Sequence, residues 1–163
     1  GSEMCIRDRY PGTFDPITNG HFDLMKRGLK IFDQIIVAVA ENSQKQTLLS
    51  LQQRVDLVNE VTKDIKAIDV MTLDKLVVDF ARDHSATVIL RGLRAISDFE
   101  YEVQLASINR SMEPLIESVF MSPAEEYSFL SSSIVKDIAR HNGDTSKYVH
   151  PSVSEVLREK YLK

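Results

Sequence analysis

The sequence predicts an α/β fold, with a Rossmann-like open parallel sheet of five strands and helices on both faces. Short apolar runs alternate along the chain with longer segments in which apolar residues recur every three or four positions. Continuous apolar runs are typical of strands buried on both faces, and the longer spacing is typical of amphipathic helices. Their alternation predicts parallel strands joined by right-handed crossovers.

The bulk composition fits one globular domain. The chain has 163 residues, of which 43% are hydrophobic and 27% charged, with a formal net charge of −4. A net negative charge gives no nucleic-acid footprint, and no run of about 18 apolar residues is long enough to span a membrane. The single cysteine, Cys5, excludes an internal disulfide framework. We therefore expect a cytoplasmic protein with no nucleic-acid or membrane partner.

The first nine residues depart from this pattern. Gly1-Ser2 resembles an expression-tag remnant, and residues 3–9 are too polar for the buried strand that should precede a phosphate-binding loop. We interpret residues 1–9 as a tag or atypical leader that includes the start of strand 1, and residues 10–163 as a single domain. Sequencing the gene from its source would test the hypothesis that this leader is foreign to the protein.

The segment 10–21, Tyr-Pro-Gly-Thr-Phe-Asp-Pro-Ile-Thr-Asn-Gly-His, holds two Pro and two Gly and cannot be regular structure throughout. Thr18 and Asn19 are good N-cap residues, and an apolar helical stripe follows at Phe22, Met25, Leu29 and Phe32. The segment is therefore a loop that delivers His21 into the first turn of a helix, where free N–H groups suit a phosphate.

Further elements follow in order. We expect strands at 34–40, 68–72, 87–90 and 118–121, and a polar loop at 41–49. Ser50 and Gln53 form a capping-box pattern that opens a helix. Other helices are expected near 76–84, from Asp98 to Pro114, at 131–140 and at 151–161. The helix from Asp98 carries an apolar stripe at Tyr101, Leu105, Ile108 and Met112.

Because ligands of open parallel sheets bind at the carboxyl ends of the strands, the loops there should face one crevice. These loops carry His21, Lys45, the pair Arg91 and Arg94, and the serines 131–133. Each has a plainer interpretation: a helix-capping histidine, a surface lysine, solvated loop arginines and N-capping serines. No Walker A motif or Gly-x-Gly-x-x-Gly fingerprint is present, which disfavours P-loop kinases and dinucleotide oxidoreductases.

Three motifs carry a family resemblance. Residues 18–21 match the (Thr/His)-x-Gly-His signature of the nucleotidyltransferase superfamily, and the whole string 10–21 resembles the bacterial phosphopantetheine adenylyltransferase family. Arg-Gly-Leu-Arg at 91–94, followed by Asp-Phe-Glu-Tyr-Glu at 98–102, is similar to that family too. The serine stretch resembles the superfamily's Ile-Ser-Ser-(Thr/Ser)-x-x-(Arg/Lys) signature, with Leu130 replacing Ile and Lys136 at the last position.

The resemblance implies transfer of AMP from ATP to 4′-phosphopantetheine, giving dephospho-coenzyme A and pyrophosphate in coenzyme A biosynthesis. It also implies Mg²⁺ as cofactor, a homohexamer and feedback binding of coenzyme A. No residue of the chain itself is predicted as a metal ligand.

The same resemblance assigns roles to residues. The catalytic group would be His21 as transition-state stabiliser, with Lys45 and Arg94. The acceptor-binding residues would be Thr13, Lys45, Val77 and Arg91. The ATP-binding residues would be Thr13, Phe14, His21, Gly92, Leu93, Arg94, Glu102, Tyr127, Ser128, Phe129, Leu130, Ser131, Ser132 and Ser133.

Two other functions remain open. A different adenylyl- or cytidylyltransferase would share the first and last motifs but use another acceptor. A nucleotide-binding regulatory domain would bind ATP without acceptor-dependent release of pyrophosphate. A panel of phosphate acceptors separates all three.

Overall fold

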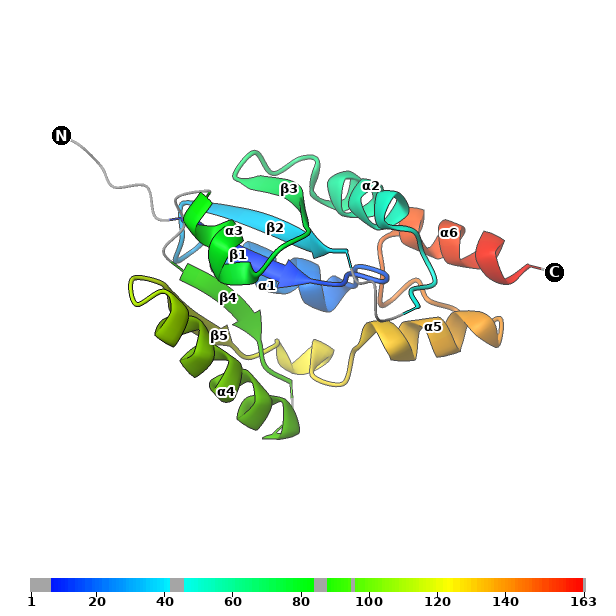
Figure 1. Cartoon of the computed structure of the whole chain (residues 1–163). Coiled ribbons are helices and arrows are strands. Elements are labelled where there is room, and N and C mark those ends of the chain that lie inside the picture. Colours follow the sequence, from blue (N-terminus) through cyan, green and yellow to red (C-terminus); the bar gives the residue numbers. More distant parts are fainter. Residues whose placement is uncertain (1–6, 42–45, 84–87, 95, 163) are drawn as a thin grey trace.

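A five-stranded, all-parallel sheet with the order β3-β2-β1-β4-β5 forms the centre of the protein, which confirms the predicted fold class (Figure 1). The computed structural model describes residues 7–41, 46–83, 88–94 and 96–162. The strands are β1 Arg7–Gly12, β2 Gln34–Ala40, β3 Ile68–Leu73, β4 Val88–Gly92 and β5 Glu117–Met121.

The helices are α1 Asn19–Gly28, α2 Leu51–Thr62, α3 Val77–Asp83, α4 Ile96–Met112, α5 Ser132–Arg140 and α6 Pro151–Tyr161, with a short 3₁₀ helix, η1, at Glu125–Tyr127. The helices α1, α2 and α6 begin where the capping residues in the sequence predict. Thr18 and Ser50 cap α1 and α2 through reciprocal capping boxes, and Pro151 occupies the first turn of α6. None of the described helices is long and apolar enough to cross a membrane.

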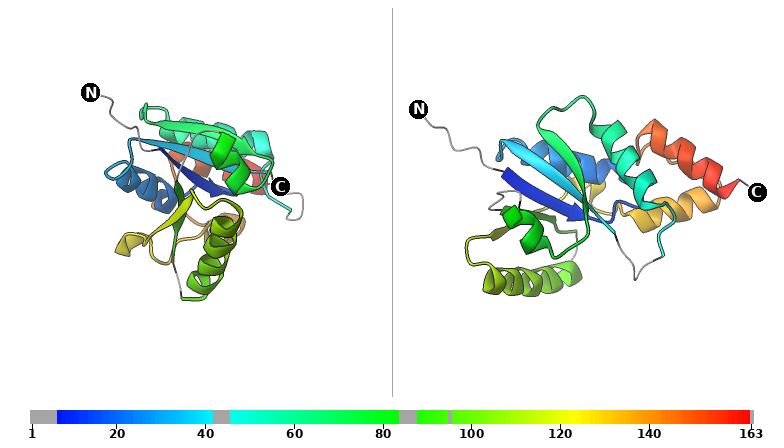
Figure 2. Two further views of the ribbon diagram at one scale, coloured as in Figure 1. Left: turned by 60° about the vertical axis from the view of Figure 1, so that its left-hand side comes forward. Right: turned by 45° about the horizontal axis from the view of Figure 1, so that its top comes forward.

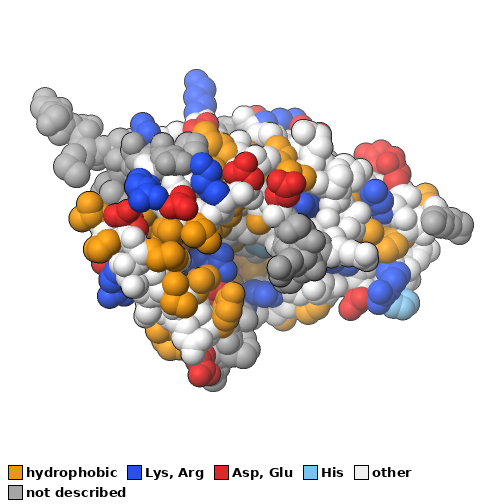
Figure 3. Space-filling model, viewed as in Figure 1, with side chains coloured by type: hydrophobic (Ala, Val, Ile, Leu, Met, Phe, Trp, Pro, Cys, Tyr) orange, Lys and Arg blue, Asp and Glu red, His pale blue; other side chains and the backbone are white. Residues whose placement is uncertain are grey.

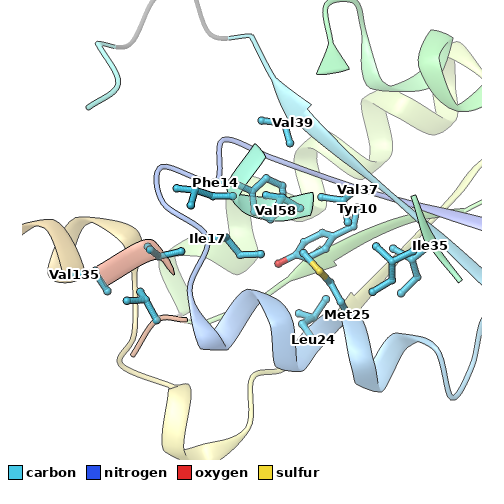
Figure 4. Packing of buried hydrophobic residues seen from close by; sticks show 14 of the residues in the cluster. Tyr10, Phe14, Ile17, Leu24, Met25, Ile35, Val37, Val39, Val58 and Val135 are labelled. Carbon is cyan, nitrogen blue, oxygen red and sulfur yellow. The ribbon is translucent and has the colours of Figure 1, made fainter. Parts of the chain in front are cut away.

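Helices cover both faces of the sheet (Figure 2). Ile35, Val37 and Val39 of β2 point into the larger cluster, which includes buried residues of α1, α2, α5 and α6 (Figure 4). The alternate residues Ile36 and Ala38 pack with Phe80 of α3 on the other face. Strand alternation therefore explains why the run 34–40 is apolar at nearly every position. Beyond the carboxyl ends of β1 and β2 lie α5 and α6 (Figures 1 and 2).

The predicted boundaries shift around β4. Arg91 and Gly92, predicted in a loop, are the last residues of the strand, because they pair in parallel register with Phe120 and Met121 of β5. The following helix begins at Ile96, two residues before the predicted start at Asp98.

The apolar stripe predicted on α4 does not enter the core. Tyr101, Ile108 and Met112 are 62%, 55% and 48% exposed, whereas Glu102, Ala106 and Asn109 are buried. The spacing predicted the helix and its apolar face, but spacing does not say what covers that face.

The start of β1 also differs from the prediction. Residues 7–9 form a strand, although we predicted them to be too polar, and Asp8 and Arg9 are fully buried. Asp8 pairs with Ile35 of β2 and Val88 of β4, so backbone pairing on both sides holds the segment in the centre of the sheet. Pairing of backbone groups does not depend on the side chains, which explains how a polar segment occupies this position.

Candidate functional site

The amino end of α1 holds His21 in a defined orientation. The side-chain oxygen of Thr18 accepts a hydrogen bond from the backbone N–H of His21 at 3.3 Å, and His21 Nδ1 accepts one from the backbone N–H of Thr18 at 2.9 Å. Because Nδ1 accepts here, the neutral ring carries its proton on Nε2, which is left as a donor. Burial, and secondly the charge of Arg94, lower the pKa of His21 to about 4. The ring is therefore a neutral donor at pH 7.

Aromatic packing fixes the His21 ring further. Its centroid lies 4.9 Å from that of Phe14 and 6.5 Å from that of Tyr10. Phe14 is 2% exposed and has a φ of 51°, a left-handed conformation that is uncommon for a bulky residue. Because its side chain is buried, Phe14 can offer a ligand little more than its backbone.

A buried network anchors the loop between β1 and α1. The Asp15 carboxylate accepts hydrogen bonds from the backbone N–H groups of Leu48 and Leu49, each at 2.9 Å, and from Lys136 Nζ at 3.0 Å. The network joins the loop to the segment after β2 and to α5. Lys136 is therefore paired with Asp15 here.

Arg54 of α2 supports the same region. Its guanidinium donates to the carbonyl oxygens of Thr13 and Ala40, both at 2.8 Å, and to that of Leu49 at 3.3 Å. Asp15 and Arg54 were not among the site residues predicted from the sequence. A signal existed for Arg54, because a charged residue at this position lies three residues after Leu51 and four before Val58, on the face that the apolar residues define.

The start of α5 lies against the start of α1. A Cβ atom built on Gly20 would lie 3.5 Å from Tyr127 and 3.7 Å from Leu130, and Ser132 Oγ donates to the carbonyl of Pro16 at 2.7 Å. Arg94 Nη1 donates to the carbonyl of Leu130 at 3.2 Å. The structure thus brings together His21, Arg94 and the serine stretch from three distant parts of the chain.

The three serines have different environments. Ser131 caps α5 by accepting from the N–H of Ile134 at 3.1 Å, and Ser132 is committed to Pro16. Ser133 has an exposed side chain in the first turn. The helix start therefore offers an anion its free N–H groups and Ser133 most readily.

The residues before the serines differ as well. Leu130 is a core residue with 3% exposure, and Ser128 Oγ donates to the carbonyl of Glu125. Phe129 is 56% exposed and packs edge-on against Tyr148, with ring centroids 6.2 Å apart. Tyr127 is half-buried at the end of η1. Side chains of Phe129 and Tyr127 are therefore accessible to a ligand, and that of Leu130 is not.

Arg91 and Glu102 form an ion pair between β4 and α4. Arg91 Nε and Nη2 donate to the two carboxylate oxygens of Glu102 at 2.8 and 2.6 Å. At Gly92, a Cβ would come within 2.9 Å of Leu24, so the strand end approaches α1 closely. Leu93 continues the strand pairing through its N–H, which donates to the carbonyl of Met121.

Val77, a predicted acceptor-binding residue, packs outside this group. Val77 begins α3 and is half-buried against two small apolar clusters. Lys45 lies outside the described residues. Figure 3 shows Lys and Arg side chains near the centre of the face over β4, next to hydrophobic side chains.

The comparisons with known proteins agree with this architecture. The model of the cytidylyltransferase-like family matches residues 9–138. The chain belongs to the cytidylyltransferase-like family. The matched residues include the loop after β1, Arg91 and Arg94, and the serines 131–133.

Two solved structures share the fold. A putative nicotinate-nucleotide adenylyltransferase from Vibrio parahaemolyticus superposes with a TM-score of 0.75 at 16% identity, covering 98% of each chain. A lipopolysaccharide core biosynthesis protein from Thermoplasma volcanium gives a TM-score of 0.58 at 23% identity, covering 74% of this chain and 98% of its own. At these identities the likeness concerns the fold.

Proposed function

We propose that this cytidylyltransferase-like protein transfers the adenylyl group of ATP to 4′-phosphopantetheine, giving dephospho-coenzyme A and pyrophosphate. The observation that carries the proposal is the meeting of two helix starts with the neutral His21 ring and Arg94. The choice of acceptor rests on the motifs at 10–21 and 91–102, which resemble the phosphopantetheine adenylyltransferase family.

In the proposed reaction, an oxygen of the acceptor phosphate forms a bond to the α-phosphorus of ATP, and the bond from that phosphorus to the bridging oxygen breaks to release pyrophosphate. Such transfers need positioning and charge stabilisation more than covalent catalysis. His21 Nε2–H would donate to an α-phosphate oxygen as negative charge develops. The N–H groups at the start of α5, with Arg94, would hold the leaving pyrophosphate.

Mg²⁺ fits this arrangement as an ion held mainly by the nucleotide. Among the described residues, no three His, Cys, Asp or Glu side chains form a group that could hold a metal, and Asp15 is committed to two N–H groups and Lys136. Mg²⁺ commonly binds through substrate phosphates and waters, where it neutralises charge on the leaving group. The residues present are compatible with that mode.

The exposed face of α4 supports the proposed homohexamer. Large hydrophobic side chains are exposed along it and just beyond it, at Phe99, Tyr101, Val103, Ile108, Met112 and Leu115. Tyr101, Ile108 and Met112 recur at helical spacing and share one exposed side of α4, and an exposed apolar side of this kind indicates an interaction surface. Analytical ultracentrifugation of the protein and of Ile108→Asp tests this: we expect a hexamer that the substitution dissociates, and a monomeric parent protein would reject it.

The decisive experiment measures pyrophosphate release from ATP with a panel of acceptors: 4′-phosphopantetheine, nicotinate mononucleotide, glycerol 3-phosphate and a no-acceptor control. We expect release with 4′-phosphopantetheine, and its inhibition by coenzyme A if feedback binding occurs. Release with another acceptor alone would assign a different nucleotidyltransferase. ATP binding without release under any condition would assign a regulatory domain.

A further inference from the structure

The Arg91 guanidinium is held by Glu102 and by the carbonyl of Pro11. Nε and Nη2 form a two-pronged contact with the Glu102 carboxylate, and Nη1 donates to the carbonyl of Pro11 at 3.3 Å. Paired contacts of this type fix the plane of the guanidinium as well as its position. The orientation of Arg91 is therefore set by α4 and β1 together.

Part of the guanidinium remains available. An arginine has five N–H bonds, and three of those on Arg91 are used in these contacts. The other two, one on each terminal nitrogen, have no acceptor among the described residues. The Arg91 side chain is 27% exposed, so a ligand can reach it. An anion could thus bind this edge while Glu102 stays in place.

Glu102 itself is poorly placed to bind a nucleotide. Its side chain is only 9% exposed, and both of its oxygens accept from Arg91. A nucleotide hydroxyl would have to displace a charge-assisted hydrogen bond in order to reach this carboxylate, and such bonds are stronger than neutral ones. This geometry differs from the nucleotide-contacting role that the sequence motif predicts.

The two arginines of the motif consequently differ in charge balance. Glu102 neutralises Arg91, whereas Arg94 Nη1 donates to the uncharged carbonyl of Leu130. Among the described residues no carboxylate pairs with Arg94. The highly charged triphosphate is therefore attracted more strongly to Arg94, and the neutralised Arg91 is left for the less charged acceptor phosphate.

We propose that Glu102 is a positioning residue that holds Arg91 edge-on for the phosphate of the acceptor substrate. This inference rests on the proposed function. The inference assigns Glu102 to the binding of one substrate. Glu102 acts on acceptor binding through Arg91 and contributes little to ATP binding.

Steady-state kinetics of Glu102→Ala and Glu102→Gln test the inference. For Glu102→Ala we expect the KM for 4′-phosphopantetheine to rise about tenfold while the KM for ATP changes less than about twofold. Glu102→Gln, which keeps one acceptor oxygen, should lie between the parent protein and the alanine variant. Glu100→Ala is the matched control, because Glu100 is an exposed acid on the same helix. It should leave both constants unchanged.

A second measurement does not depend on turnover. The Arg91 Nε–H should give a slowly exchanging NMR signal that disappears in Glu102→Ala and in Arg91→Lys. The double variant Arg91→Ala/Glu102→Ala should bind acceptor no more weakly than Arg91→Ala alone, because Glu102 acts through Arg91.

The outcomes separate two failures. If the parent protein releases pyrophosphate but the Glu102 variants raise the KM for ATP as much as that for acceptor, or leave the acceptor KM unchanged, the inference is wrong and the proposed function stands. If the parent protein releases no pyrophosphate with any acceptor, both are wrong. Circular dichroism checks that each variant folds, and Glu102→Gln serves if the alanine variant does not.

Discussion

Two buried aspartates lie at opposite ends of the first strand and its loop, and their surroundings differ. Asp8 is fully buried, and neither carboxylate oxygen has a hydrogen-bond partner among the described residues. Asp15 is 4% exposed and accepts from two backbone N–H groups and from Lys136. A buried charge is costly unless it is paired and hydrogen-bonded. Asp15 therefore organises its region, whereas Asp8 destabilises the strand that contains it.

The largest effect is expected from Asp15→Ala. The change leaves Lys136 and the N–H groups of Leu48 and Leu49 without their acceptor, and breaking a buried pair typically costs about 3–5 kcal/mol. Denaturant unfolding measures this loss, and Asp64→Asn, at an exposed position, is the control. A loss below about 1 kcal/mol would show that the network around Asp15 does not stabilise the fold.

His21 tests whether a half-buried polar group near the carboxyl end of β1 is also functional. His21→Gln can keep the reciprocal cap of α1, since Gln is a usual partner at this position. With its amide oxygen in the cap, its N–H groups lie on the adjacent nitrogen and do not occupy the position of the imidazole Nε2–H. We expect kcat to fall by about 10²–10³ with a small change in the KM for ATP. His21→Ala should show the same loss in kcat together with a less stable helix start. A kcat loss confined to His21→Ala would indicate that capping alone matters.

Asp8→Val should act in the opposite direction to Asp15→Ala. Burial raises the pKa of Asp8 to about 7, with its own backbone and Arg9 opposing the shift. Replacing the carboxylate by an apolar side chain should stabilise the protein by roughly 2–4 kcal/mol at pH 8, since a pKa unit corresponds to about 1.4 kcal/mol. Thermal or denaturant unfolding measures this gain. An unchanged or lower stability would mean that Asp8 has a partner the contacts do not reveal.

The pH dependence of stability gives a sharper form of the same test. In the unfolded chain an aspartate loses its proton near pH 4, whereas folded Asp8 keeps it up to about pH 7. The folded state therefore binds more protons in this window, and stability falls as pH rises from about 4 to about 7. The difference in stability between Asp8→Val and the parent protein should grow across that window and stay constant above it.

The pH profile of kcat offers a contrast between Asp8 and His21. Because burial lowers the pKa of His21 to about 4, its ring is neutral throughout the range from pH 6 to 8. We expect no titration step near the ordinary histidine value of about 6.5 in the kcat profile. The profile should be measured in Asp8→Val, so that the stability change of the parent protein does not enter it. A step near 6.5 that is absent from the profile of His21→Gln would show that His21 titrates normally, because the ionisation of the acceptor phosphate is common to both.

The smallest effect is expected from Ser132→Ala. It removes one hydrogen bond between α5 and the loop, from Ser132 Oγ to the carbonyl of Pro16, which is worth about 1 kcal/mol. Ser133→Ala is the matched control for stability, because its side chain is exposed. Equal unfolding free energies for the two variants would show that this bond does not hold the two helix starts together.

The predictions that succeeded rest on local rules. The capping boxes at Thr18 and Ser50, the Pro151 start of α6 and the apolar run of β2 are all local patterns, and each formed the expected element. The order of the elements along the chain also predicts which loops lie at the carboxyl ends of the strands. It does not give the distance between them, and the roles assigned to Lys45, Val77 and the other site residues stay predictions.

The sequence by itself therefore determined the order and kind of the elements and the nucleotidyltransferase superfamily of the chain. Only the tertiary structure decided which polar groups are paired: Lys136 with Asp15, Arg91 with Glu102, and Arg54 with three carbonyls. It also decided that the apolar stripe of α4 faces outward and that a polar segment completes β1. The physical reason is that helix and strand periodicity depends on near neighbours, whereas burial and ion pairing depend on segments that meet only when the chain is folded.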